Sequence, residues 1–318
     1  MIRAWVVEDG ASRECEAAEA IDRATRPGTA CAWLDFEGGG EVLQTPLLNP
    51  LNVHPLVLED MAIEINRPKV DDYGSYLYLV VHSARWDGER PALRELDIVL
   101  GGRFLLTYHD EPTRSITAAH EVLGRRPELL SPQPARLLHY ILDVLVDHYL
   151  PIVDRVAEDI DAIEESLFRD DDSHLHERVV KLKRGMSALR RIVGPQRDTV
   201  LALTRDEFTA IPGEMRPYLR DVYDRLARVS DLLDSFRDEA ATLLDLNVAV
   251  NANRLNEVIK RLTVIATVGL PLTVVTSYYG MNFALPEYRW PHSELFAAGL
   301  MVVTALVTWL YLRWRRWL

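Results

Sequence analysis

One segment decides the fold of this chain: Leu262–Asn282, with the sequence LTVIATVGLPLTVVTSYYGMN. Its residues from Leu262 to Tyr279 form an 18-residue run without a charged side chain. At about 1.5 Å per residue, a helix of this length nearly spans the hydrocarbon core of a bilayer, which is roughly 30 Å thick. We therefore predict a membrane-spanning helix that ends in a Tyr-Gly-Met-Asn turn.

A second uncharged run, Leu295–Leu312, follows after a short polar loop and leads into the terminal sequence RWRRWL. Basic residues flank the two runs on the sides away from this loop, and they are Arg254, Lys260, Arg261, Arg313, Arg315 and Arg316. The loop itself offers only Arg289 and His292. By the positive-inside rule, we expect a multi-pass protein of the cytoplasmic (inner) membrane with both termini in the cytoplasm.

The charge of the chain is distributed unevenly. The 318 residues include 36 Lys and Arg and 48 Asp and Glu, for a net charge of −12. From Arg254 onward the balance is +4, so the preceding part carries −16. Such an acidic part repels nucleic-acid phosphates and attracts cations, which excludes nucleic acid as an expected partner. The first residues, MIRAWVVEDG, contain no apolar core of signal-peptide length, and Cys15 and Cys31 match no metal-binding spacing, so we expect reduced thiols.

The N-terminal part, residues 1–130, is predicted to be a mixed α/β cytoplasmic domain. Gly101-Gly102 lies between two runs rich in β-forming residues and predicts a hairpin turn. The expected strands are Arg3–Val7, Ala30–Phe36, Ser75–Ala84, Leu96–Leu100 and Arg103–His109, and the expected helices are Pro55–Met61 and Ser115–Leu123.

The rest of the chain has helical periodicity. Arg136–Phe168 and Leu175–Leu203 are predicted to form a helical hairpin of opposite charge within residues 131–216. One helix is then expected from Pro217 to Gly280, about 95 Å long. Its heptad seam consists of Leu219, Val222, Leu226, Val229, Leu233, Phe236, Ala240 and Leu243. A helix this long needs packing partners along that seam. We therefore divide it into a stalk, 217–261, that continues into a two-span transmembrane domain, 262–318, whose outer loop is 280–294.

The same spacing marks one face of the membrane-spanning helix. That face carries Asn256, Ile259, Leu262 or Thr263, Ala266, Leu270, Thr273 and Ser277. Its ends are polar and its middle is small or apolar, which suits a pore that closes by dewetting. Two spans cannot enclose a pore, so transport would require a symmetric ring of subunits. Ordinary packing between helices with small residues explains the periodicity equally well.

The sequence YGMNF at the end of the first span resembles the signature of the CorA family of divalent-cation channels. The whole stretch Asn256–Phe283 is similar to the pore helix of that family. The loop sequence ALPEYRWP and the tail RWRRWL are similar to its Met-Pro-Glu-Leu loop and its basic tail. Weaker similarity covers His54–Asp60, Arg67–Val81 and Arg220–Leu226.

The resemblance implies an α+β membrane protein that forms a homopentamer, in which a long stalk helix is continuous with the first of two spans. It implies transport of Mg²⁺, and of Co²⁺ or Ni²⁺, with Gly280, Met281 and Asn282 as the selectivity filter for the hydrated ion. Neutral amide oxygens suit this task because Mg²⁺ gives up its water reluctantly. The pore positions carried over are Asn256, Ile259, Leu262, Leu270, Thr273 and Ser277, and Glu287 in the loop would add negative charge at the mouth.

The family also senses intracellular Mg²⁺ at acidic sites between subunits. Asp221, in the sequence RDVYDRL, resembles a regulatory carboxylate of the family, and Asp87 and Asp143 are the candidate partners. The expected ligands are thus transported and regulatory Mg²⁺, with no organic cofactor, and the expected partners are other copies of the chain and membrane lipid. A structural salt bridge is the alternative role for these carboxylates.

Two other functions remain open from the sequence. The zinc-transporting, proton-coupled ZntB branch shares the two spans and a related tripeptide. A membrane-tethered binding domain would use the same spans as an anchor. The sequence contains no Ser-His-Asp set, nucleophile elbow or phosphate loop, so we do not expect an enzyme.

Overall fold

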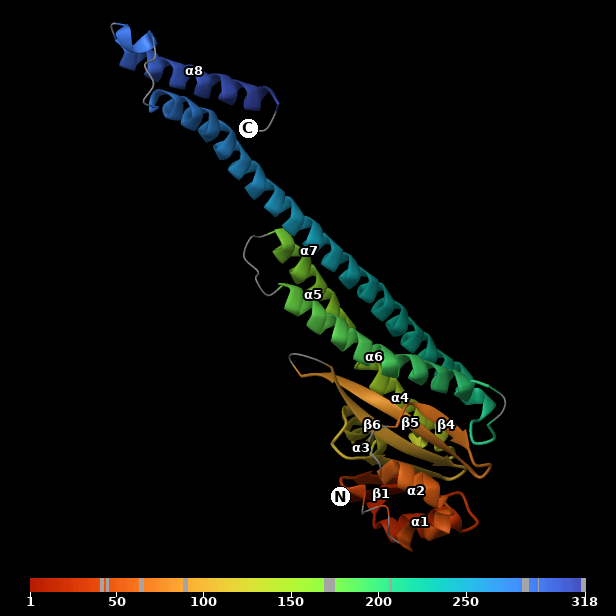
Figure 1. Cartoon of the computed structure of the whole chain (residues 1–318). Coiled ribbons are helices and arrows are strands. Elements are labelled where there is room, and N and C mark those ends of the chain that lie inside the picture. Colours follow the sequence, from red (N-terminus) through yellow and green to blue (C-terminus); the bar gives the residue numbers. More distant parts are fainter. Residues whose placement is uncertain are drawn as a thin grey trace. The chain divides into compact units, whose positions relative to one another are not determined.

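The computed structural model describes residues 1–40, 43, 46–62, 66–87, 91–168, 175–205, 208–281, 286–290 and 292–315. The chain divides into two compact units, Met1–Leu243 and Leu244–Leu318 (Figure 1). The first unit contains the sheet and most of the helices, and the second contains the two apolar helical segments near the C-terminus.

A seven-stranded sheet forms the centre of the first unit, in the order β2-β1-β3-β7-β6-β5-β4. Neighbouring strands are antiparallel except for β3 and β7, which are parallel. The strands are β1 (Ile2–Glu8), β2 (Ala11–Cys15), β3 (Cys31–Glu37), β4 (Lys69–Asp72), β5 (Tyr76–Trp86), β6 (Pro91–Gly101) and β7 (Phe104–His109). The mixed α/β class and the hairpin at Gly101-Gly102 are confirmed. Two edge strands, β2 and β4, were not predicted, because both are short and polar and lack a period-two apolar pattern.

Helices cover both faces of this sheet. The described helices of the first unit are α1 (Ala17–Thr25), α2 (Pro55–Ala62), α3 (Arg114–Leu123), α4 (Ala135–Asp147), α5 (Leu150–Phe168), α6 (Leu175–Leu203) and the first part of α7 (Arg216–Tyr279). Short 3-10 helices lie at Pro46–Leu51 (η2), Pro127–Leu129 (η3) and Gly213–Met215 (η4). On one face, α1, η2 and α2 pack on a core that includes Leu34, Phe36 and Tyr78. On the other face, α3 packs against α4, and α4 and α6 contact the central strands.

The predicted helix Arg136–Phe168 is wrong as one element, because the structure divides it into α4 and α5. The cause is Pro151, which has no N–H to donate to the carbonyl of Asp147 and whose ring would clash with that carbonyl. The chain therefore bends at His148 and Tyr149, and Pro151 occupies the first turn of α5, where proline is tolerated.

Helix α7 is continuous for 64 residues, as the sequence predicts. The predicted seam is buried from Leu219 to Leu243, with Phe236 half-buried and Ser230 added to it. Beyond that point the helix no longer has a buried face, and every residue from Asn251 to Leu262 is exposed. Leu255, Ile259 and Leu262 are exposed among them, by 60%, 50% and 61%. Apolar side chains in such a position need a partner outside the chain.

A buried polar cluster ties α3 to the sheet. Asp35 on β3 is 4% exposed and accepts hydrogen bonds from Thr107 at 2.5 Å and from His120 Nε2 at 2.8 Å. Trp5 donates its indole N–H to the other ring nitrogen of His120 at 3.0 Å, which fixes a neutral tautomer with the proton on Nε2. His109 Nε2 lies 3.2 Å from Asp35, while His109 Nδ1 contacts the carbonyl of Glu111 at 2.9 Å. Both nitrogens of His109 thus face acceptors, which favours its charged form.

The pKa values of this cluster follow from these contacts. Burial opposes the charge on Asp35, but the contacts of its carboxylate with His109 and His120 outweigh it and lower the pKa of Asp35 to about 2. Burial likewise opposes the charge on His109, but the Asp35 carboxylate raises the pKa of that histidine. A raised pKa in the folded state stabilises the fold below the unfolded pKa of about 6.5 and loses this contribution as the pH rises through the folded value.

We predict that His109→Gln destabilises the chain at pH 5.5 and that the difference from wild type shrinks as the pH rises above the raised pKa of His109. At pH 5.5 the expected loss is about 2 kcal/mol, or a fall in Tm of about 4–8 °C. Thermal unfolding of the full chain in detergent between pH 5.5 and 9 measures this. The exposed His176→Gln variant is the control and should follow wild type throughout. A His109→Gln deficit that is independent of pH would contradict the ion pair.

Candidate functional site

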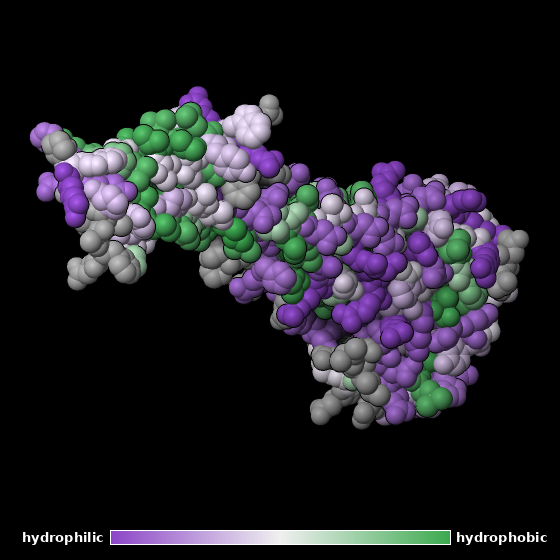
Figure 2. Space-filling model, turned by 45° about the horizontal axis from the view of Figure 1, so that its top comes forward, coloured by the Kyte–Doolittle hydropathy of each residue, from purple (hydrophilic) through white to green (hydrophobic). Residues whose placement is uncertain are grey.

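Two apolar helices dominate the second unit. The first is the C-terminal part of α7, and the second is α8 (Ser293–Trp314). None of the apolar window of α7 and only 6% of that of α8 is buried within the chain. Figure 2 shows the apolar side chains gathered on this part of the surface, whereas the surface of the α/β part is mostly hydrophilic. Core helices of a soluble protein would be covered, so two exposed apolar helices of this length fit membrane spans.

The predicted pore positions share one exposed face of α7. Ile259, Leu262 and Leu270 are 50%, 61% and 66% exposed, and Asn256, Ala266, Thr273 and Ser277 are exposed as well. At 100° per residue these positions fall within a stripe about 120° wide along the helix. We call this set the α7 stripe.

The half-buried residues of α7 lie on the opposite side of the helix. They include Val264, Val268, Pro271 and Val275, again at intervals of three and four. Within the second unit, α8 returns from the loop at this end of α7 (Figure 1). From Thr263 onward this side of α7 is half-buried, whereas the α7 stripe is mostly exposed in the described part of the chain. This arrangement leaves the stripe free to face a pore axis or a neighbouring copy.

Threonine hydroxyls in this segment donate to the helix backbone. Thr273 Oγ1 donates to the carbonyl of Gly269 at 3.0 Å, and Thr263, Thr267 and Thr276 make the same i−4 bond. The donor of Thr273 is thus used within the helix, and its oxygen keeps lone pairs for an outside donor. The water molecules around a hydrated cation present their hydrogens outward, so they are donors of the matching kind.

The predicted filter lies at the end of α7, and the structure describes two of its three residues. Gly280 N–H donates to the carbonyl of Thr276 at 2.9 Å, and a Cβ on Gly280 would lie 3.1 Å from that oxygen. Close approach of the backbone, and not a left-handed conformation, is what favours glycine here. Met281 is 47% exposed. Asn282 lies outside the described residues.

The loop after the turn contains the 3-10 helix η5 (Pro286–Arg289), which positions Glu287. The carboxylate of Glu287 is half-buried, and its Oε2 atom has no hydrogen-bond partner among the described residues. An acceptor of this kind is costly to bury unless a donor, a cation or water satisfies it.

Two of the three predicted regulatory carboxylates meet at one arginine. Arg225 on α7 forms ion pairs with Asp143 and Asp147 on α4 and with Asp221 one turn earlier on α7. The Asp221 contact measures 2.9 Å and the Asp147 contact 2.5 Å. Burial opposes the charge on Arg225, but the carboxylates outweigh it and raise its pKa. We call these four residues the Arg225 cluster.

Sequence reasoning missed Arg225 and Asp147 as members of this cluster. The i, i+4 spacings Asp143/Asp147 and Asp221/Arg225 were present in the sequence, but they do not show which helices face each other. Asp87, the third predicted carboxylate, is exposed just after the end of β5 and is not among the partners of Arg225. Among the described residues, no group of three or more His, Cys, Asp or Glu side chains is arranged to hold a metal ion.

Comparisons with known proteins agree with this architecture. A solved structure of the CorA magnesium transporter from Methanocaldococcus jannaschii superposes with a TM-score of 0.84 at 18% identity, covering 98% of this chain and 97% of the other. The ZntB cytoplasmic domain from Vibrio parahaemolyticus superposes with a TM-score of 0.62 at 15% identity, covering 80% of this chain and 98% of the other. At these identities both comparisons show the fold alone.

Sequence comparison identifies the family. The cobalt/magnesium transport protein CorA of Thermotoga maritima is 32% identical over 270 residues, which are 84% of this chain and 77% of that protein. The family described as CorA-like Mg²⁺ transporter protein matches residues 29–316. The chain therefore belongs to the CorA-like Mg²⁺ transporter family, as its resemblance predicts.

Proposed function

We propose that copies of this chain form a homopentameric ring in which the α7 stripes line a pore for divalent cations, with Mg²⁺ as the main ion. The family consists of transporters, which confirms the prediction that the chain is not an enzyme. The observation that carries the proposal is the exposed α7 stripe, polar at both ends and apolar between them. A single chain leaves this stripe uncovered, and a closed ring of copies places it around a common axis.

Asn282 is the proposed selectivity residue, with Gly280 and Met281 forming the end of the helix that presents it. A ring of neutral amides binds the water shell of Mg²⁺ through hydrogen bonds and does not require dehydration, which Mg²⁺ resists. Ser277 and Thr273 continue this path as hydroxyl acceptors, about one and two turns inside. Glu287 would add negative charge at the entrance and raise the local cation concentration.

The apolar part of the α7 stripe is the proposed gate. Ile259, Leu262 and Leu270 would surround a narrow apolar passage that water leaves when the ring is closed. Asn256 would mark its cytoplasmic end. Both termini would then lie in the cytoplasm of a cell whose inner membrane holds the two spans, with residues 1–130, 131–216 and 217–261 on that side and 262–318 in the membrane.

Intracellular Mg²⁺ would regulate the gate through carboxylates at the subunit borders. Asp221 and Asp143 are the proposed ligands, and Asp87, just after the end of β5, is the proposed third ligand. Arg225 satisfies Asp221 and Asp143 within one chain. A divalent cation would therefore compete with this guanidinium or use carboxylates that a neighbouring copy adds. Binding at the borders favours the closed ring, and its loss favours the open state.

Asn282→Ala tests the filter. We expect Mg²⁺ uptake into proteoliposomes to follow an imposed membrane potential in wild type and to lose selectivity or fall at least about tenfold in the variant. Asn247→Ala on the cytoplasmic part of α7 is the matched control and should retain wild-type uptake. Uptake of Zn²⁺ that follows a proton gradient would instead place the chain in the ZntB-like class, and no flux of either ion would favour a membrane tether.

Leu270→Ser tests the gate. A hydroxyl in the apolar passage should hold water there and raise Mg²⁺ flux under inhibiting internal Mg²⁺, by about tenfold or more. Leu306→Ser on α8 introduces the same change in a span that we place outside the pore. Equal flux in the two variants would contradict the assignment of Leu270 to the pore.

Arg225→Gln tests the sensor, because it leaves the carboxylates of the Arg225 cluster without their internal cation. The internal Mg²⁺ concentration for half-maximal inhibition should fall severalfold, since the metal no longer competes with the guanidinium. Arg220→Gln removes an exposed charge from the same helix and should leave the inhibition unchanged. If Arg225→Gln only lowers Tm and leaves the Mg²⁺ dependence intact, the cluster is a structural salt bridge.

A further inference from the structure

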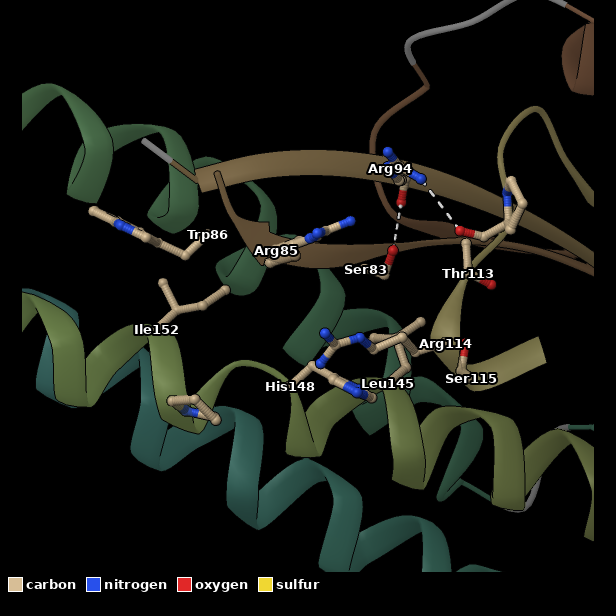
Figure 3. A pocket seen from close by; sticks show the side chains of 13 residues that line it. Ser83, Arg85, Trp86, Arg94, Thr113, Arg114, Ser115, Leu145, His148 and Ile152 are labelled. Carbon is tan, nitrogen blue, oxygen red and sulfur yellow. Dashed lines mark hydrogen bonds between the residues drawn. The ribbon is translucent and has the colours of Figure 1, made fainter. Parts of the chain in front are cut away.

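A cavity of about 330 Å³ lies at the N-terminus of α3, between the end of β5 and the junction of α4 and α5 (Figure 3). Its chemistry differs from that of the surrounding protein. Three arginines and one histidine line it: Arg85, Arg94, Arg114 and His148. None of the described residues that line it is Asp or Glu, although the chain as a whole carries a net charge of −12.

Two of these arginines have no ion-pair partner among the described residues. They are Arg85, at the exposed end of β5, and Arg114, the first residue of α3. Arg94 is held in place, because it forms an ion pair with Glu111 and donates to the carbonyl of Pro112 at 3.2 Å. Figure 3 shows the Arg114 side chain beside His148 and Arg85 on the strand above them, all lining the same cavity. Two unpaired guanidinium groups that line one cavity attract a multivalent anion.

Two buried hydroxyl groups also line this cavity and lack partners. Thr113 is 3% exposed and Ser115 is 1% exposed, and neither side-chain oxygen has a hydrogen-bond partner in the described part of the chain. Thr113 occupies the N-cap position of α3 but makes no capping hydrogen bond with its side chain. A buried hydroxyl without a hydrogen-bond partner is costly, so two of them at one cavity favour a ligand that satisfies them.

The backbone adds further donors. The first N–H groups of a helix have no partner within it, and here the cap residue does not satisfy them. The helix dipole favours negative charge at the same point. Helix α3 is fixed in this orientation because His120, near its other end, is bonded to both Asp35 and Trp5.

We infer that this cavity is a binding site for a phosphate group, either inorganic phosphate or the phosphate of a small phosphomonoester. A phosphate carries strong acceptor oxygens pointing in several directions, which matches hydroxyl, backbone and guanidinium donors arriving from different elements. His148 Nδ1 donates to the carbonyl of Val144 at 2.6 Å, so its Nε2 is an acceptor that can take the hydrogen of a P–OH group. The volume is at the small end of ligand sites and suits a compact anion. The site does not depend on the proposed pore.

Titration of the purified full-length chain with inorganic phosphate tests the site, in magnesium-free buffer of constant ionic strength and by calorimetry. We expect one phosphate per chain in wild type and a loss of affinity of about tenfold or more in Arg114→Gln and in Arg85→Gln. Arg125→Gln, an exposed arginine just past the other end of α3, removes the same charge and should bind as wild type does. A second titration adds AMP, a phosphomonoester, to the chain loaded with inorganic phosphate. Displacement of the phosphate by AMP would show that the site accepts an ester, and no displacement would show that it takes free phosphate alone.

Ser115→Ala separates a binding role from a structural one. The variant removes a buried hydroxyl that lacks a partner, so Tm without phosphate should stay the same or rise. Phosphate affinity should fall severalfold at the same time. The inference is overturned if wild type shows no saturable binding up to about 10 mM phosphate, or if Arg114→Gln and Arg125→Gln bind equally.

Discussion

The structure depends on how a 64-residue helix buries its side chains. In proteins most helix stability comes from packing of an apolar face and not from the helix's own hydrogen bonds, so the apolar faces of α7 need a surface to pack on. Up to Leu243 the chain supplies that surface itself, and the heptad seam is buried. From Asn251 to Leu262 every residue of the helix is exposed in the described part of the chain. In the span that follows, half-buried and exposed residues occupy opposite sides of the helix. The exposed α7 stripe is the consequence, and the ring of copies that we propose would cover it.

The part of the chain before the spans carries most of the negative charge, and some of its carboxylates form ion pairs within the chain. Arg225 pairs with three of them. This pairing means that Asp143 and Asp221 are not a preformed metal site within one chain. A sensor built from them must exchange one cation for another, and such an exchange makes occupancy depend on Mg²⁺ concentration. The cavity at α3 shows the reverse case, because two of its arginines and two of its hydroxyls have no partner among the described residues.

Much of this could be predicted from the sequence, because long apolar or periodic segments have few alternatives. The two spans, the length of α7, its seam and the Gly101-Gly102 hairpin all follow from local patterns. The break between α4 and α5 was missed because the apolar period continues through Pro151. The Arg225 cluster and the α3 cavity join residues far apart in sequence, such as Arg85, Arg114 and His148, and no spacing rule reveals such meetings. The role of Asn282 stays a prediction.

The central claim is that the α7 stripe faces water shared between copies of the chain. Cysteine accessibility tests it most directly, in a background with Cys15→Ser and Cys31→Ala. Thr273→Cys and Ser277→Cys should react with a membrane-impermeant thiol reagent added from the loop side, and the reaction should block Mg²⁺ uptake. Val275→Cys, at the same depth on the half-buried side, should remain unreactive. Equal labelling on both sides of the helix, or labelling of Val275→Cys alone, would contradict the pore.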